Sequence, residues 1–348
     1  MKSSFLEEDV TLLLKDITGA VKPLPTKERE RRIQSGTHYS EMLPLEYQPT
    51  KSYIEIYEKA LDVFGQSTAD AVASVSERII KNKGKDVVIV SLARAGTPIG
   101  VLIKRYIQLK YGFSCPHYSI SIIRDRGIDH NAIKYILNRH NAENIQFVDG
   151  WTGKGVIYNE LRKEIRQFEG VSDDLAVIAD PAYITELCGT HDDIMIPSSC
   201  LNCTVCGLIS RTFLQEDVIG KNDFHGAAYY GELTSQDRTY EFIDSVVGRF
   251  NFNIEPIQEE KSSKVNDVQM LSQKYQIDNI NFIKPGIGET TRVLLRRVPW
   301  KVIIDERYRE NTELDHIRQL AKEKQVEIEY ATLNNYKCCG LIKQLSDV

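Results

Sequence analysis

The clearest chemical pattern lies in the stretch IQFVDGWTGKG, residues 145–155. Its apolar first half predicts a strand that delivers Asp149 to its carboxyl end. Four residues then open a predicted helix: Thr152, Gly153, Lys154 and Gly155. Backbone N–H groups at a helix start bind phosphate, glycines allow close approach, and a carboxylate accepts hydrogen bonds from sugar hydroxyls. The stretch therefore predicts a sugar-phosphate site, and the absent GxxxxGK[ST] spacing excludes a P-loop.

A second loop, Arg94, Ala95 and Gly96, follows the first predicted strand of the same sheet. The two loops in this order resemble the type I phosphoribosyltransferases. The resemblance implies that Asp149 and Arg94 are catalytic, that residues 94–96 bind pyrophosphate, and that residues 152–155 bind the 5′-phosphate. It also implies Mg²⁺ with phosphoribosyl pyrophosphate as substrate. The chain departs from that pattern because Gly150 replaces a second acid and the loop is shorter.

Other polar residues are candidates for the acceptor side of such a site. In this fold a hood covers the acceptor base, and residues 38–41 are a candidate for it, while Arg124 follows a predicted strand and suits a mobile flap. Asp180 ends the fourth strand, and Cys200 and His225 come after it. The full set is His38, Tyr39, Ser40, Glu41, Arg124, Asp180, Cys200 and His225. A plain surface role is an equally good interpretation of the loop residues.

Three cysteines recur at three-residue intervals: Cys200, Cys203 and Cys206. Together with Cys188 and His191 upstream, they could form a Cys/Cys/Cys/His set of zinc ligands. However, the segment is apolar and rich in β-branched residues, and it lacks the glycine-rich knuckle of zinc sites. We predict packing or cavity residues and no metal. A thiol peptidase built on Cys200 with His191 or His225 is the alternative, although no known peptidase signature surrounds Cys200.

Five segments carry a more specific resemblance: residues 35–47, 90–102, 147–155, 196–214 and 223–233. Over nearly its whole length the chain is similar to the bacterial cysteine protease StiP family, found with tellurite-resistance operons. Members look like an orphan phosphoribosyltransferase domain joined to a Pelota-type RNA-binding domain, in operons suspected of making a nucleoside-like metabolite.

The turn GIGETTR, residues 286–292, is similar to the RNA-contacting turn of Pelota and kink-turn-binding proteins. The resemblance carries over to Glu289, Thr291 and Arg292, while Gly288 stands where an Asn reads a base. Arg296 extends the basic face along the same predicted helix. Structured RNA is therefore an expected partner, and a solvated basic helix is the alternative.

The elements that position these residues alternate regularly. Strands are predicted at residues 86–92, 118–123, 144–149 and 175–179, separated by helices at 98–111, 131–140 and 156–168, after a long helix at 52–81. This alternation predicts a parallel sheet covered on both faces, and such sheets bind ligands at the carboxyl ends of their strands. The remainder alternates again and is expected to end in a helix.

The predicted fold class is thus α/β: a type I phosphoribosyltransferase-like sheet with an N-terminal hood, plus a small Pelota-like α/β domain. The predicted limits are 1–252 for the first domain, 253–278 for a linker and 279–348 for the second domain. The 348 residues suit two domains, and 42% apolar residues exclude a mostly disordered chain.

Charge and cysteine usage bound the partners and the compartment. The net charge of −5 gives no global field that would attract nucleic acid, although residues 279–348 are slightly basic. No signal peptide or membrane segment is predicted, and seven cysteines indicate reduced thiols in a cytoplasm. A homodimer is compatible with the sequence, which does not fix the oligomeric state.

Together these features predict a phosphoribosyltransferase that moves a 5-phosphoribosyl group between pyrophosphate and a nitrogenous acceptor. Charge on the departing pyrophosphate would be stabilised by Mg²⁺ and Arg94. The two alternatives are the thiol peptidase and a non-catalytic protein that binds nucleotides or RNA.

Overall fold

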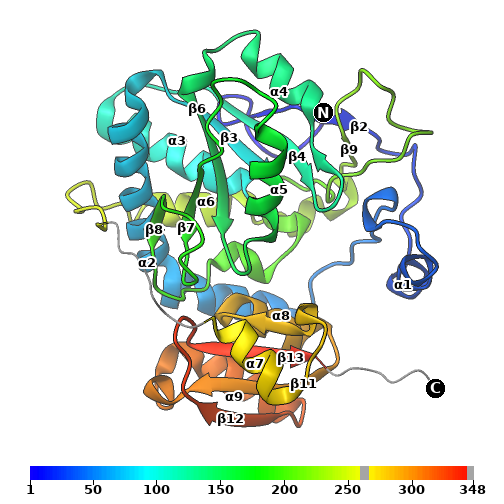
Figure 1. Ribbon diagram of the computed structural model, residues 1–348, viewed down its shortest axis with the longest axis vertical. Coiled ribbons are helices and arrows are strands. Elements are labelled where there is room, and N and C mark those ends of the chain that lie inside the picture. The colour runs from blue at the N-terminus through cyan, green and yellow to red at the C-terminus, as the bar shows by residue number, and fades with distance from the viewer. Residues whose placement is uncertain (259–265, 343–348) are drawn as a thin grey trace.

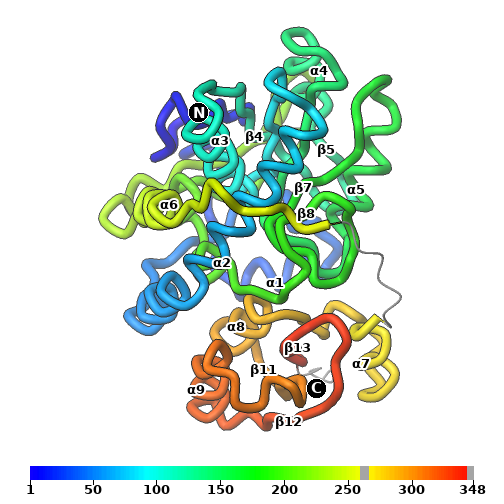
Figure 2. Tube along the Cα trace, turned by 90° about the vertical axis from the view of Figure 1, so that its left-hand side faces the viewer, coloured from blue at the N-terminus to red at the C-terminus, as the bar shows by residue number. Residues whose placement is uncertain are grey.

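A computed structural model describes residues 1–258 and 266–342. The first part of the chain forms a sheet between two layers of helices, and the C-terminal part forms a smaller domain below it (Figure 1). In the view turned by 90°, helix α8 (Ile287–Arg296) of the C-terminal domain lies below helix α2 (Lys51–Lys83) of the first domain (Figure 2). No helix of the described residues is long and apolar enough to cross a membrane.

The central sheet has seven strands in the order β1-β4-β3-β6-β7-β8, with β5 paired to β4. Its strands are β1 Thr11–Leu12, β3 Val88–Ala93, β4 His117–Ile123, β5 Gly127–Ile128, β6 Ile145–Trp151, β7 Leu175–Ala179 and β8 Cys188–Thr190. All pairs along this path are parallel, and β5 is antiparallel to β4. The predicted parallel α/β sheet is confirmed, whereas nothing in the strand order specifies a phosphoribosyltransferase.

Side-chain alternation along the strands builds a core on each face of this sheet. Ile89, Val148 and Ile178 pack on the face covered by α2 (Lys51–Lys83), α3 (Thr97–Tyr111) and α6 (Thr239–Val247). Val90 and Phe147 pack on the opposite face, under α4 (His130–Leu137) and α5 (Val156–Ile165). Strands buried on both faces need apolar residues at every position, which explains the continuous apolar runs.

The N-terminal segments close the first domain against distant parts of the chain. Strand β2, Lys15–Asp16, pairs with β9, Gly226–Ala227. Helix α1, Thr26–Gln34, buries none of its residues. Short 3₁₀ turns η1 to η6 fill the connections: Tyr39–Glu41, Gly84–Asp86, Ala142–Asn144, Pro197–Cys200, Cys203–Val205 and Gly231–Gln236.

The C-terminal domain is a four-stranded sheet in the order β10-β13-β11-β12. Its elements are α7 Asp267–Tyr275, η7 Ile280–Phe282, β10 Ile283–Pro285, α8 Ile287–Arg296, β11 Pro299–Asp305, η8 Glu306–Tyr308, η9 Thr312–Leu314, α9 Asp315–Glu323, β12 Glu327–Ala331 and β13 Cys338–Ile342. The prediction of a last helix is wrong: Cys338–Ile342 is a strand, buried between β10 and β11. Residues 343–348 of that prediction lie outside the described residues.

The predicted linker, residues 253–278, contains helix α7. Val268 and Leu271 of α7 pack with Ile283 and Ile303 in the core of the C-terminal domain. Asp267 fixes the start of this helix to the loop before β13, because its carboxylate accepts hydrogen bonds from the backbone amides of Asn334 and Asn335, each at 2.7 Å.

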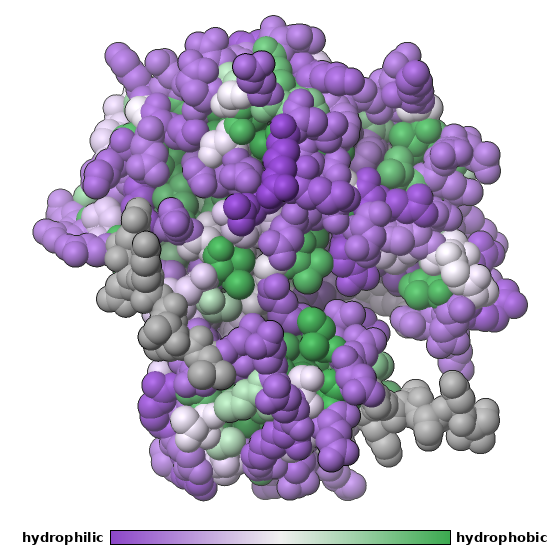
Figure 3. Space-filling model, in the orientation of Figure 1, coloured by the Kyte–Doolittle hydropathy of each residue, from purple (hydrophilic) through white to green (hydrophobic). Residues whose placement is uncertain are grey.

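The two domains share a continuous apolar core. Met195 and Cys200 of the first domain belong to one buried cluster with Ile287, Leu294 and Val302 of the second. Figure 3 shows a largely hydrophilic surface, with apolar side chains gathered where the domains meet and a hollow beside them. Apolar contact of this kind fixes one domain against the other more firmly than a polar junction does.

Candidate functional site

A cavity of about 440 Å³ lies at the carboxyl ends of β3 and β6. After β3 the chain adds β4 on one side of that strand and then β6 on the other side, and ligands of open α/β sheets bind at such a switch point in the strand order. Arg94 and Ala95 line the cavity after β3, and Asp149 lines it at the end of β6. The structure thus brings the two predicted loops together, with Thr152, Gly153, Lys154 and Gly155 in the same wall.

Glycines allow these two loops to approach each other. A Cβ on Gly96 would lie 2.7 Å from the carbonyl oxygen of Leu92 and 3.1 Å from Oδ1 of Asp149. Gly155 has a φ of +74° directly before α5, a conformation that side chains rarely adopt. The sequence pattern therefore reflects a real steric demand at the sheet edge.

Asp149 is the acidic group of this cavity. Burial raises the pKa of its carboxyl to about 7, although Oδ1 accepts a hydrogen bond of 2.7 Å from the amide of Gly150. Arg94 does not touch it, because Arg94 forms an ion pair of 3.1 Å with Glu46.

The loop after β6 is tied down from two sides. The Thr152 hydroxyl donates to Oδ1 of Asp180 at 2.5 Å. From the C-terminal domain, the Tyr336 hydroxyl donates to the Gly153 carbonyl at 2.7 Å. Lys154 donates to the carbonyl of Ile280 at 2.8 Å, so the residue predicted to hold a phosphate also binds the second domain.

The predicted hood residues reach the flap candidate at the cavity rim. The Tyr39 hydroxyl accepts a hydrogen bond of 3.0 Å from the Arg124 amide, and Glu41 pairs with Arg126 at 2.7 Å. His38 instead bonds Ser40, with 2.8 Å between Nδ1 and Oγ. His225 lies elsewhere, bonded through Nδ1 to Ser121 Oγ at 2.8 Å, and it does not line the cavity.

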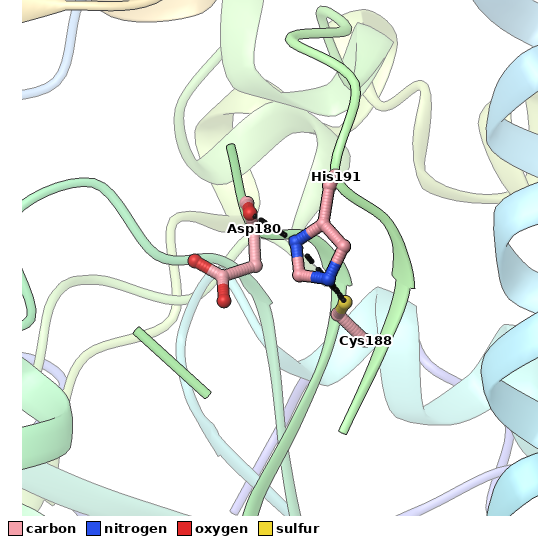
Figure 4. A group of neighbouring side chains, drawn as sticks. All are labelled: Asp180, Cys188 and His191. Carbon is pink, nitrogen blue, oxygen red and sulfur yellow. Dashed lines mark hydrogen bonds between the residues drawn. The ribbon is translucent and has the colours of Figure 1, made fainter. Parts of the chain in front are cut away.

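A cysteine and a histidine meet at the far edge of the sheet. Cys188 lies on edge strand β8, and its Sγ is 3.5 Å from Nε2 of His191 (Figure 4). His191 Nδ1 lies 2.7 Å from the backbone carbonyl oxygen of Asp180, and its ring stacks on Tyr183 at 3.8 Å. Sγ also lies 3.8 Å from Nδ1, so the thiol lies beside the imidazole ring, which a third group holds in place.

The thiol of this pair is covered. Cys188 is fully buried, and burial raises the pKa of its thiol to about 12. Donor atoms of Asp180, Cys188 and His191 lie within 4.8 Å of one another, close enough for a metal ion. However, the Asp180 carboxylate already accepts hydrogen bonds from Thr152 and from the Thr185 amide, at 2.5 Å and 2.8 Å.

Cys200 has no such partner among the described residues. Its Sγ lies 3.7 Å from Sδ of Met195, it is buried, and burial raises its thiol pKa to about 12. Cys203 and Cys206 are also buried and free, and Cys206 lines the cavity. His191, predicted as a partner for Cys200, instead contacts Cys188, which lies three residues before it at the start of β8.

The residues predicted to contact RNA lie in the domain junction. A Cβ on Gly288 would lie 3.1 Å from Ser199 Oγ, and Thr291 is buried. Arg296 donates to Asn202 Oδ1 at 2.6 Å and to the Cys200 carbonyl at 2.8 Å. Glu289 and Arg292 form an ion pair of 2.8 Å and line the cavity.

Asp193 holds this junction from the first domain. Its carboxylate accepts hydrogen bonds from the Ile287 amide at the start of α8 and from the Lys337 amide, at 3.1 Å and 2.9 Å. Asp193 was not among the predicted site residues, because its partners Ile287 and Lys337 lie about 90 and 140 residues further along the chain.

The fold and these sites define a two-domain α/β protein with a cysteine–histidine pair and a small C-terminal α/β domain. The family model described as tellurite-like stress resistance cysteine protease StiP matches residues 3–247, and the chain belongs to this family. The PELOTA RNA binding domain model matches residues 262–344. Cysteine protease StiP of Acinetobacter baylyi is similar to this chain, 36% identical over 367 aligned positions that cover 98% of this chain and 94% of the relative.

These comparisons confirm the predicted family and correct the predicted activity. Phosphoribosyltransferase is wrong as the main function, and with it phosphoribosyl pyrophosphate, because the family and the relative are both described as cysteine proteases. The loops misled the interpretation, since glycine turns at the carboxyl ends of parallel strands arise in many α/β folds whatever their chemistry. Mg²⁺ stays a prediction.

Proposed function

We propose that this chain is a cysteine protease in which Cys188 is the nucleophile and His191 the general base. The observation that carries the proposal is the 3.5 Å contact between Cys188 Sγ and His191 Nε2. The family model and the relative's name support the activity. The contact supports Cys188 rather than Cys200 as the nucleophile, since no histidine of the described residues is bonded to Cys200.

In the described conformation Cys188 Sγ lies 3.5 Å from Nε2 and 3.8 Å from Nδ1, beside the ring and away from the in-plane lone pair of Nε2, so the ring must turn before it can accept the thiol proton. Nδ1 carries a proton when it donates to the Asp180 carbonyl, which leaves Nε2 free to accept the proton of Cys188. The thiolate then attacks a peptide carbonyl carbon, and the departing amine takes the proton from Nε2. Water hydrolyses the resulting thioester and restores the thiol.

The described conformation is a resting one. A thiol with a pKa of about 12 is neutral at physiological pH, and Arg78 of α2 donates to the Cys188 carbonyl at 3.0 Å beside it. Activity therefore requires the edge of the sheet at β8 to open, so that substrate reaches Sγ and the ion pair forms.

Hydrolysis of a fluorogenic casein by the full chain tests the proposal. We expect Cys188→Ser and His191→Ala each to lower activity by at least about 10³-fold, as loss of a catalytic nucleophile or base does. Cys200→Ser is the matched control, because it changes another buried thiol and should retain activity. Melting temperatures of all three variants separate misfolding from loss of chemistry. Full activity of a folded Cys188→Ser variant would refute the assignment.

The sheet order also bears on fold ancestry. Strands β4-β3-β6-β7-β8 follow the doubly wound order of flavodoxin-like proteins, and the loops after β3 and β6 keep the pattern that resembles type I phosphoribosyltransferases. We propose a phosphoribosyltransferase-like fold that here carries another function, as folds often do. The seven unpaired cysteines support action in a reducing cytoplasm.

RNA binding by the C-terminal domain is a second proposed function, supported by the PELOTA match. Because Gly288, Thr291 and Arg296 face the first domain, RNA would contact the exposed residues at the C-terminal end of α8, where Arg297, directly after the helix, leaves 57% of its side chain exposed. Mobility shifts of the full chain with structured RNA test this. Arg297→Ala should weaken binding of all RNAs alike, with a reduced dependence on salt. The absence of any shift at low salt would refute it.

A further inference from the structure

The cavity at the sheet edge has walls from both domains. Arg94, Arg124 and Lys154 line it from the first domain, and Lys284 and Arg292 line it from the second. Neither domain alone encloses this space, since β10 and α8 face the loops after β3 and β6 across it. The cysteine–histidine pair is not among its lining residues.

These five cations outnumber the acids of the cavity wall, Asp149 and Glu289. Glu289 is shared, at 2.8 Å from Arg292 and 4.0 Å from Lys284. The hydrogen bonds of Lys154 go to the carbonyls of Ile280 and Ile283 rather than to a carboxylate. Arg94 and Arg124 pair with acids outside the lining, Glu46 at 3.1 Å and Asp125 at 3.3 Å, so the positive charge that remains in the cavity lies mainly on Lys154 and Lys284.

The pKa values of the two lysines in the cavity are lowered. Burial, and then the neighbouring Lys284 and Arg124, lower the pKa of Lys154 to about 8. The pKa of Lys284 is likewise lowered, first by burial. Like charges held together at this cost are stabilised when an anion binds between them.

The backbone offers donors at the same wall. Gly153, Lys154 and Gly155 line the cavity directly before the ten-residue helix α5. Among the hydrogen bonds of residues 1–258 and 266–342, none is donated by the amides of these three residues. Amides at the start of a helix and lysine side chains together form the usual surroundings of a bound phosphate group.

We infer that this composite cavity binds a ligand that carries a phosphate monoester, and that both domains hold it. A volume of about 440 Å³ suits a molecule of nucleotide size. The phosphate belongs either to a free small molecule or to the 5′ end of an RNA, and the two share the same recognition. The inference concerns binding and requires no transfer chemistry.

Titration calorimetry on the full chain tests the inference with four probes: a nucleoside, its 5′-monophosphate, and one short RNA with a 5′-phosphate or a 5′-hydroxyl. We expect the monophosphate to bind and the nucleoside not to bind. If the phosphorylated RNA binds more tightly than the monophosphate, and the hydroxyl RNA does not bind, the source is an RNA end. Equal binding of nucleoside and monophosphate would overturn the inference.

Variants decide whether both domains take part. Arg124→Gln in the first domain and Lys284→Gln in the second should each weaken binding about 10-fold or more, since each loses a charge-assisted contact. Lys322→Gln on the exposed side of α9 is the matched control and should bind normally. If Lys284→Gln binds normally, the composite site is refuted. Cys188→Ser should bind as the parent does, which separates this inference from the proposed protease.

Discussion

Cys188 and the composite cavity lie on one sheet, but water reaches only one of them. Cys188 is fully buried on β8, with α2 packed over it and a thiol pKa of about 12. In the cavity, by contrast, Arg124 and Arg292 each leave 44% of their side chains exposed, and charges of both signs face solvent. A ligand can therefore enter the cavity in the described conformation, whereas the cysteine requires a structural change first. The accessible site and the chemically reactive pair are two different places.

Asp180 connects these two regions. Its side chain accepts a hydrogen bond from Thr152 in the cavity wall, and its backbone carbonyl orients His191. A ligand that moves the Thr152 loop thus acts directly on the residue that holds the base. Such a link couples the sites energetically if the two states of the loop differ in their effect on His191.

The largest expected effect breaks the buried region while leaving the cavity intact. A Cβ on Gly189 would lie 2.1 Å from the carbonyl oxygen of Ala71 on α2, so Gly189→Ala must force strand and helix apart. We expect a loss of about 3 kcal/mol in the free energy of unfolding. Gly150→Ala is the control in the cavity wall, where the nearest atom would lie at an ordinary 3.6 Å. Urea unfolding measures both, and equal losses would contradict the comparison.

An intermediate effect is expected at the residue shared by the two regions. Asp180→Ala leaves the buried Thr152 hydroxyl and the Thr185 amide without their acceptor, at a cost of about 2 kcal/mol. The variant keeps the backbone carbonyl that orients His191, so casein hydrolysis should fall together with monophosphate binding only if movement of the Thr152 loop reaches His191 through residue 180. Loss of only one of these activities would show that Asp180 does not couple the regions.

The smallest expected effect sharpens the electrostatic side of the comparison. Burial raises the pKa of Asp149 to about 7, above the value of about 3.9 in an unfolded chain. The folded state then binds more protons, so this contribution to stability is full below about pH 4 and is lost as pH rises through 7. Between pH 4 and pH 8, the free energy of unfolding should therefore fall by about 1–2 kcal/mol less in Asp149→Asn than in the parent, because water in the cavity screens part of the effect of burial.

Thermal unfolding from pH 4 to pH 8 measures this contribution. Asp193, whose pKa burial also raises to about 7, supplies a second part of the slope at the domain junction. Asp193→Asn should therefore flatten the curve independently. An unchanged slope in Asp149→Asn would mean that its carboxyl ionises normally in the folded protein.

Local pattern predicted much of this structure. Periodicity found the long helix, here Lys51–Lys83, and the four main strands, because each is set by its own apolar residues. Glycine spacing correctly brought Asp149, Arg94 and the Thr152 loop to one sheet edge. The last strand was missed because Cys338–Ile342 is a short apolar run whose type is decided by its neighbours β10 and β11.

The nature of the sites was harder to predict. The sequence pattern suggested only a zinc-ligand role for Cys188. The conformation of the chain directly after β8, which brings the His191 ring to Cys188 Sγ, could not be predicted from residue types. The turn at residues 286–292, which resembles the RNA-contacting turn of Pelota proteins, was recognised from the sequence. The contacts of Gly288 with Ser199 and of Arg296 with Asn202 could not be predicted, because they depend on how the two domains pack. The residue types indicated which catalytic and binding roles were possible, and the tertiary contacts showed which of these residues lie close enough to act together.

The pairing of Lys15–Asp16 with Gly226–Ala227 bears on how the chain folds. These two strands are separated by nearly the entire first domain, so their ends meet only after the intervening sheet has formed. Contacts between such distant segments slow folding compared with helical proteins of similar size. Strand β1 lies just before β2 in the chain and covers the edge of β4. Until the N-terminal segment docks, this edge of β4 is open to pairing with other chains. Refolding at high concentration should therefore favour aggregation, and dilution should restore the yield of native protein.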